Sequence, residues 1–143
     1  MRIYQAGPLF SEAEQNWHRG LRAQLEAAGF EVVWPGDLIP QAQIAAWGTD
    51  AKRRIFERCR DELLASDLVV ALLDGTQVDD GTAWEIGCAY QAGKPVYGIR
   101  TDFRQAGECQ GALVNCMIEC SCQMVVRSVT KLIGGLLSHV KEE

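Results

Sequence analysis

The sequence predicts an α/β fold, a single-domain three-layer α/β/α sandwich around a five-stranded parallel sheet of the flavodoxin or Rossmann kind. Short apolar runs alternate with stretches of helical periodicity along the whole chain, as in consecutive βαβ units. The run 68–73 is apolar at every position, which is typical of a central strand buried on both faces. With 143 residues, 48% of them hydrophobic, the chain can form one compact core, so we expect residues 1–143 to be one domain.

The first predicted strand covers residues 1–6 and ends at the Gly-Pro turn that follows it. Ser11 and Glu14 have the spacing of a capping box, so a helix is expected to begin there. Its apolar residues recur at helical spacing until Gly29, which can end the helix.

Residues 30–34 predict a second strand. Residues 35–49 show no clear period and predict a long loop, of a length that often serves ligand binding in small domains. Asp50 can cap a helix over residues 51–65, whose apolar residues share one face.

After the strand at 68–73, a helix is expected to begin near Gly81 and to end at Gly93, where a fourth strand follows over 95–100. The remainder predicts a loop over 101–111, a short helix over 113–118 and a fifth strand over 123–126. Ser128 can cap a last helix through Val140. Two consecutive glycines weaken that helix, so tertiary packing must hold it.

Charge and hydropathy exclude several classes of partner. The formal net charge is −5 and the densest basic run is Lys52-Arg53-Arg54, so nucleic acid is not an expected partner. No apolar stretch approaches the ~18 residues that would cross a bilayer. The N-terminus predicts a strand rather than a signal peptide, so we expect a cytoplasmic protein with no membrane partner.

The six cysteines do not predict a disulfide framework or a metal site. In a chain of this length without a secretory signal, disulfides are not expected. The spacing of the last three lacks the paired C-x-x-C pattern of structural zinc, and no histidine lies nearby. A thiol-redox or metal protein built on the 109–122 group is left as an alternative. The cysteines are Cys59, Cys88, Cys109, Cys116, Cys120 and Cys122.

Three carboxylates follow the buried strand at its junction with the next helix: Asp74, Asp79 and Glu85. In an open parallel sheet this junction faces the ligand crevice. Glu85 lies within about one turn of the predicted helix start, where an anion is favoured and a carboxylate can attack an electron-poor carbon. His18 and His139 are both expected on the surface, which leaves carboxylates as acids and bases. Such a set suits substitution at a glycosidic carbon.

The loop after the first strand offers a second candidate wall of the site. It lacks both the G-x-G-x-x-G pattern and the P-loop lysine, so a dinucleotide is poorly supported. Gly7 either forms a tight turn alone or lets a sugar approach the backbone. Tyr4 either fills the core or orients Glu85 by a hydrogen bond.

These same residues resemble the nucleoside 2-deoxyribosyltransferase family in three blocks. The middle block is the most specific of the three. The blocks are Ile3 to Phe10, the run Asp67 to Val96 with Asp79-Asp80-Gly81-Thr82-Ala83-Trp84-Glu85-Ile86-Gly87 at its centre, and Asn115-Cys116-Met117.

The resemblance implies a role for each matching residue. Glu85 would be the nucleophile at C1′ of a 2′-deoxyribonucleoside, Tyr4 would position it, and Asp79 would hold the sugar hydroxyl at the 5′ carbon. Asn115, with the backbone around Met117, would reach the sugar in a neighbouring subunit. The family implies a homo-oligomer, no metal and no organic cofactor, with a deoxyribonucleoside and a free nucleobase as small-molecule partners.

Gly7, Gly81 and Asp74 are also expected to line the substrate site. The reaction implied is a retaining double displacement through a deoxyribosyl ester of Glu85, and water as acceptor would give hydrolysis instead.

One position departs from the family pattern: Cys59 stands where the family often has an aspartate that contacts the base. Base contacts are therefore expected from the 35–49 loop instead. The candidates there are Asp37, Gln41, Gln43 and Trp47.

Two other functions are left open. A 2′-deoxynucleoside 5′-monophosphate N-glycosidase of the same superfamily usually carries phosphate-binding donors in the first loop, and this loop has no side-chain donor before Ser11. A non-catalytic, nucleotide-binding TIR-like module would keep the fold without turnover.

Overall fold

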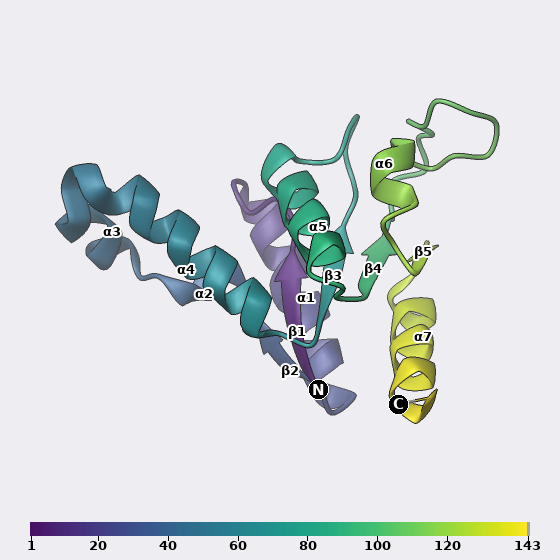
Figure 1. The fold of residues 1–143 in the computed structure, drawn as a ribbon, viewed down its shortest axis with the longest axis horizontal. Coiled ribbons are helices and arrows are strands. Elements are labelled where there is room, and N and C mark those ends of the chain that lie inside the picture. Colours follow the sequence, from purple (N-terminus) through teal and green to yellow (C-terminus); the bar gives the residue numbers. More distant parts are fainter. Residues whose placement is uncertain (143) are drawn as a thin grey trace.

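The fold is a single all-parallel sheet of five strands, seen here in a computed structural model that describes residues 1–142 (Figure 1). The strand order is β2-β1-β3-β4-β5. The predicted α/β class and the parallel five-stranded sheet are confirmed. The strands are β1 (Arg2–Ala6), β2 (Glu31–Val33), β3 (Leu68–Leu72), β4 (Val96–Ile99) and β5 (Met124–Val126). The helices are α1 (Glu12–Ala27), α2 (Pro35–Leu38), α3 (Gln41–Trp47), α4 (Ala51–Ala65), α5 (Asp80–Gln91), α6 (Cys116–Glu119) and α7 (Val129–Glu142), with a 3₁₀ turn at Gly48–Asp50.

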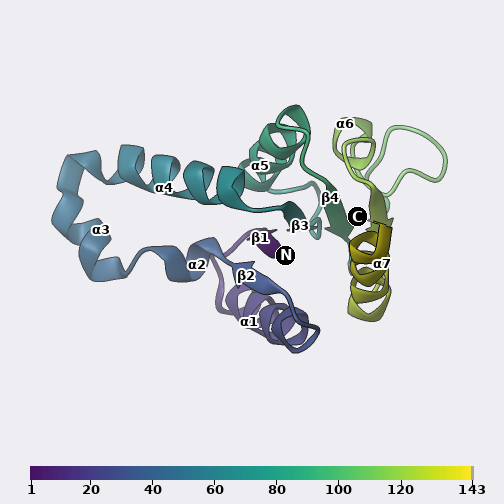
Figure 2. The ribbon, with the colours of Figure 1, turned by 60° about the horizontal axis from the view of Figure 1, so that its bottom comes forward.

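Helices cover both faces of the sheet, which gives the three layers that the sequence predicts (Figure 2). Successive residues of the central strand β3 show how the faces are divided, because side chains alternate along a strand. Val70 packs with the buried residues of α1 and α7, whereas Val69 packs with those of α4 and α5. All five residues of β3 are buried, as expected for a strand covered on both sides.

Local capping explains where the first helix begins. The hydroxyl of Ser11 accepts a hydrogen bond from the Glu14 N–H at 3.2 Å, and the Glu14 carboxylate accepts one from the Ser11 N–H at 2.8 Å. This is the predicted capping box.

The predicted loop over residues 35–49 is wrong, because the segment contains α2, α3 and the 3₁₀ turn. These helices are short and mostly exposed, so their sequence carries no clear apolar period. Pro35 stands in the first turn of α2, where its fixed φ favours a helix start. Asp50 is not the predicted cap, since it has helical dihedrals and makes no side-chain hydrogen bond to α4.

His18 is completely buried rather than on the surface. Its Nδ1 lies 2.9 Å from the side-chain nitrogen of Gln5, and its Nε2 lies 3.0 Å from the carbonyl oxygen of Pro8. Its ring also stacks on Trp34. Burial lowers the pKa of His18, so the ring is kept neutral with both nitrogens bonded, which allows an imidazole to lie in the core.

The last helix, α7, depends on its packing, as its two glycines predict. Ser128 Oγ accepts a hydrogen bond from the Lys131 N–H at 3.4 Å, close to the predicted start. A Cβ on Gly135 would lie 2.4 Å from the sulfur of Met124, so this glycine permits close approach of α7 to β5. In the described part of the chain, no helix is long and apolar enough to span a membrane.

We expect Leu136→Ala to lower the free energy of unfolding by about 2–5 kcal/mol, because Leu136 is fully buried under the sheet. Leu137, the next residue of α7, is 40% exposed, so Leu137→Ala should cost less than about 1 kcal/mol. Urea unfolding of both variants tests this pair. Equal losses would contradict the packing that holds α7.

Candidate active site

The centre of the candidate site is a hydrogen bond between β1 and α5. Tyr4 lies on the face of β1 that is turned toward α4 and α5, and its side chain is completely buried. Its hydroxyl donates to Oε1 of Glu85 at 2.5 Å. The buried face of α5, formed by Thr82, Ile86 and Ala89, fixes the helix against the sheet and directs the half-buried Glu85 toward Tyr4. The sequence left this contact as one of two readings of Tyr4, and the structure favours the hydrogen bond.

The protonation of Glu85 differs from the sequence expectation of a carboxylate kept ionised at a helix start. The helix begins at Asp80, so Glu85 lies in its second turn, where the dipole acts weakly. Burial raises the pKa of Glu85 from 4.5 to about 7, the Tyr4 hydrogen bond opposes that rise, and the charge of Asp79 adds to it. Burial and the Glu85 charge raise the pKa of Tyr4, so its hydroxyl stays protonated and acts as the donor.

Asp79 is the N-cap of α5 and lies beside Glu85 at the same cavity. Its Oδ2 accepts hydrogen bonds from the N–H of Thr82 at 2.9 Å and from the Thr82 hydroxyl at 3.0 Å. In the described part of the chain Oδ1 has no hydrogen-bond partner, so it can accept one from a ligand hydroxyl.

The cavity beside Glu85 has a volume of about 510 Å³, within the usual range for small-molecule sites. The predicted residues Gly7, Asp79, Gly81 and Glu85 line it together. The β1–α1 loop, α1, the α2–α3 segment and α4 supply the remainder of the wall. The full lining is Gly7, Leu9, Phe10, Gln15, Pro35, Gly36, Ile39, Gln41, Ile44, Ile55, Cys59, Asp79, Gly81, Thr82 and Glu85.

The β1–α1 loop is held close to the core. A Cβ on Gly7 would lie 2.5 Å from the ring of His18, so the close approach of this loop requires glycine. The N–H groups of Phe10 and Ser11 both donate to the Glu14 carboxylate, at 2.9 and 2.8 Å. The side chain of Phe10 is 81% exposed at the cavity rim.

Asp74 does not join this site. Its carboxylate accepts hydrogen bonds from the N–H groups of Thr101 at 2.6 Å and Asp102 at 2.9 Å, and also from the Thr101 hydroxyl. It therefore shapes the loop after β4 and lines a separate hollow with Arg104. The predicted substrate contact of Asp74 is not supported by its position.

Asn115 and Met117 also lie outside the cavity of their own chain. Asn115 caps α6, with Oδ1 accepting from the Met117 N–H at 3.0 Å and Nδ2 donating to Glu108. Met117 is 75% exposed on the surface.

Of the four base-contact candidates, only Gln41 lines the cavity. Asp37 is paired with Arg22, and Trp47 lies under the guanidinium of Arg54. Gln43 is exposed on α3. The alternation of cavity-facing and outward residues on short helices was hidden once the segment was taken for a loop.

Cys59 lies in the cavity wall near the nucleophile. Burial raises the pKa of its thiol, followed by the Glu85 charge, while its interaction with Tyr4 opposes the rise. The six cysteines are free thiols. Among the described residues, no group of three or more His, Cys, Asp or Glu side chains could hold a metal ion.

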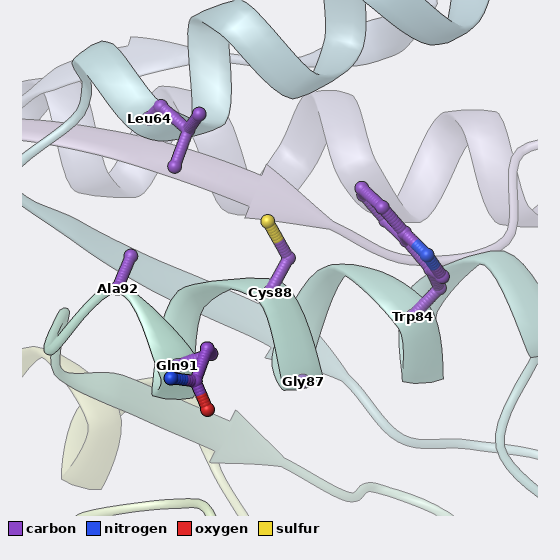
Figure 3. Close-up of a pocket in the computed structure, with 6 residues that line it drawn as sticks. All are labelled: Leu64, Trp84, Gly87, Cys88, Gln91 and Ala92. Atoms are coloured by element: carbon purple, nitrogen blue, oxygen red, sulfur yellow. The ribbon is translucent and has the colours of Figure 1, made fainter.

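A second hollow of about 500 Å³ lies between α4 and α5 (Figure 3). Leu64 of α4 points toward α5, and the sulfur of Cys88 points toward α4, whereas Gln91 turns away. Its lining is apolar and contains no carboxylate or imidazole, so the acid–base chemistry lies in the Glu85 cavity.

Comparisons with known proteins agree on one family. A family model described as nucleoside 2-deoxyribosyltransferase matches residues 3–117. No curated protein sequence matches the chain.

Several solved structures share the fold. A conserved protein from Enterococcus faecalis V583 is 29% identical, with a TM-score of 0.70 over 97% of this chain and 98% of that chain. A 2-deoxyribosyltransferase from Bacillus psychrosaccharolyticus is 23% identical, with a TM-score of 0.77 over 93% and 90% of the two chains. A 2-desoxiribosyltransferase from Leishmania mexicana is 23% identical, with a TM-score of 0.75 over 96% and 97%. A CMP N-glycosidase from Clostridium botulinum is more distant, at 18% identity and a TM-score of 0.60 over 95% and 98%.

The raised pKa of Glu85 predicts a pH-dependent stability difference between the wild type and Glu85→Gln. A carboxyl whose pKa is higher in the folded state stabilises the fold at low pH, and this contribution is lost as pH rises from 4.5 through about 7. Glutamine stays neutral and can still accept the Tyr4 hydrogen bond. Denaturant unfolding should show similar stabilities at pH 4 and an advantage of up to about 3 kcal/mol for the variant at pH 8. An advantage that does not change with pH would contradict the burial of Glu85.

Proposed function

The chain belongs to the nucleoside 2-deoxyribosyltransferase family, and from that membership we propose that it transfers 2-deoxyribose between purine or pyrimidine bases. The observation that carries the proposal is the Glu85 carboxylate, held by the Tyr4 hydroxyl at 2.5 Å at the wall of a 510 Å³ cavity. A carboxylate aimed at an anomeric carbon can act as a nucleophile without a metal or organic cofactor.

In the proposed first step an Oε atom of ionised Glu85 forms a bond to C1′ while the C1′–N bond breaks. The electron pair of that bond goes to the base, and the sugar remains as an ester of Glu85. In the second step another base forms the new C1′–N bond and the carboxylate is regenerated, with net retention at C1′. Tyr4 is the positioning residue, because its O–H fixes one carboxylate oxygen and leaves the other for attack.

Asp79 is the proposed ligand of the deoxyribose hydroxyl on the 5′ carbon. Its Oδ2 is held by Thr82, so Oδ1 has a fixed direction at the cavity. Gly7 and Gly81 would let the sugar lie close to the backbone on either side.

The second candidate is hydrolysis of deoxynucleoside 5′-monophosphates, which is supported by the fold shared with a CMP N-glycosidase. The charges of this cavity favour free nucleosides. No lysine or arginine is among its lining residues, and the N–H groups of Phe10 and Ser11 are taken by Glu14. A phosphate there would meet a carboxylate rather than donors.

We also propose that the protein is a homo-oligomer in which Asn115 and the backbone around Met117 contact the sugar bound to a neighbouring subunit. Their position outside their own cavity and the exposure of Met117 support this arrangement.

The transferase assignment predicts that incubation with thymidine or deoxyinosine and free adenine yields deoxyadenosine. Glu85→Ala should reduce the rate at least ~10³-fold, because it removes the covalent route. Chromatography follows the product, and mass analysis of the acid-quenched wild type should find deoxyribose on the peptide that contains Glu85. Unchanged activity in the variant would exclude Glu85 as the nucleophile.

The outcomes of the same assay separate the alternatives. Base release from deoxynucleoside monophosphates but not from nucleosides would replace the transferase with the glycosidase. A bound nucleotide without any turnover would favour the TIR-like module.

The Tyr4 hydrogen bond predicts the pH profile. Attack needs ionised Glu85, so kcat/KM should rise with pH through about 7. Tyr4→Phe removes the bond that lowers the Glu85 pKa, so this rise should move to higher pH, with a larger loss at pH 6 than at pH 9. Tyr90 is 62% exposed on α5, and Tyr90→Phe is the matched control that should leave the profile in place. A Tyr4→Phe profile with the wild-type midpoint would contradict the positioning role.

A further inference from the structure

We propose that the departing base leaves C1′ as an anion, without a proton from any side chain of this chain, so that the protein selects donors by the acidity of the base. The inference rests on the proposed transfer function and adds a substrate class to it. Two features carry it: the placement of the ionisable groups in the cavity and the neutral character of the wall that receives the base.

An in-line displacement fixes where the base lies. A nucleophile attacks C1′ from the side opposite to the leaving group, so the base points away from Glu85. In Figure 2 the α2–α3 segment lies below α4, across from α5, which carries Glu85. The wall for the base is therefore formed by the β1–α1 loop, the first turn of α1 and the α2–α3 segment.

That wall contains only apolar and amide side chains. No carboxylic acid, imidazole, phenol or thiol is among the residues that these elements contribute to the cavity lining. They are Gly7, Leu9, Phe10, Gln15, Pro35, Gly36, Ile39, Gln41 and Ile44.

The ionisable groups of the cavity lining are all on the side of the nucleophile. Asp79 and Glu85 belong to α5, and Cys59 belongs to α4. The Tyr4 proton is given to Glu85, and Asp79 accepts the two hydrogen bonds from Thr82. The thiol of Cys59 is coupled to Tyr4 and Glu85 rather than to the opposite wall.

The acids and the imidazole nearest to the neutral wall are engaged elsewhere. Glu14 binds the N–H groups at the end of the β1–α1 loop, and Asp37 pairs with Arg22 outside the cavity. His18 lies behind the loop, with Nε2 bonded to the Pro8 carbonyl. Among the described residues, therefore, none is placed to protonate the base.

The amides can still stabilise the leaving group without transferring a proton. Gln15 uses its N–H₂ on the Leu9 carbonyl, whereas the Gln41 side chain has no hydrogen-bond partner in the described part of the chain. A Gln41 N–H can donate to an oxygen of the base. Charge balances in the step, because the Glu85 anion becomes a neutral ester while the base leaves with the electron pair as an anion and takes its proton from water afterwards.

The substrate class follows from this balance. Oxo-pyrimidines spread the negative charge over carbonyl oxygens, so they leave more readily as anions than amino-substituted pyrimidines. Without general acid catalysis, which typically contributes ~10²–10⁴-fold, the rate must depend strongly on the acidity of the base. We infer that 2′-deoxyuridines with electron-withdrawing 5-substituents are the best donors.

Thymidine and 5-bromo-2′-deoxyuridine provide a matched test, since methyl and bromine have similar size but bromine makes the base more acidic. The single-turnover rate of base release, measured at pH 8 with saturating protein, reports the bond-breaking step. We expect the bromo donor to react at least ~10-fold faster, with Glu85→Gln as the background control for both donors.

Equal single-turnover rates for the two donors, with release still dependent on Glu85, would overturn the inference and leave the transferase assignment intact. Absence of Glu85-dependent release from either donor would instead overturn the proposed function and the inference with it.

Discussion

The hydrogen bond from Tyr4 to Glu85 is the interaction on which the site depends. It joins the second residue-pair layer of the sheet to the helix that follows β3, so it fixes both the depth of α5 and the direction of the carboxylate. It also opposes the effect of burial on Glu85, whose pKa of about 7 would otherwise be higher. Without this donor, a half-buried carboxyl would favour its protonated form, which cannot act as a nucleophile.

The sheet order explains how distant parts of the sequence meet at one cavity. β1 and β3 are parallel neighbours, with Ala6 opposite Ala71, so the loops after both strands leave the same edge. Gly7 from one loop and Asp79 from the other therefore line the same space. This is the expected place for a ligand in an open α/β sheet. The close fit of Gly7 against His18 shows why the first loop follows the core so closely.

Strong local patterns made most of the fold predictable from the sequence. The apolar run of β3, the capping box at Ser11 and the block around Glu85 each determine their own structure. The 35–49 segment was missed because α2 and α3 are short and exposed, and their cavity-facing residues Ile39, Gln41 and Ile44 gain meaning only beside α4. Asp74 and His18 were misplaced for a related reason. Their positions depend on partners far along the chain, at Thr101 and at Gln5 and Trp34, that no local spacing reveals.

The raised pKa of Glu85 is consistent with catalysis by differential stabilisation. Burial and the neighbouring Asp79 both disfavour the anion while the cavity holds only neutral groups. As the C1′–N bond breaks, positive charge develops at C1′ next to that carboxylate, and their attraction grows in the low-dielectric cavity. The interaction is therefore stronger in the transition state than with the bound nucleoside, which is the condition for it to accelerate the reaction. A fully solvated carboxylate, with its charge already satisfied by water, would gain less from the same charge at C1′.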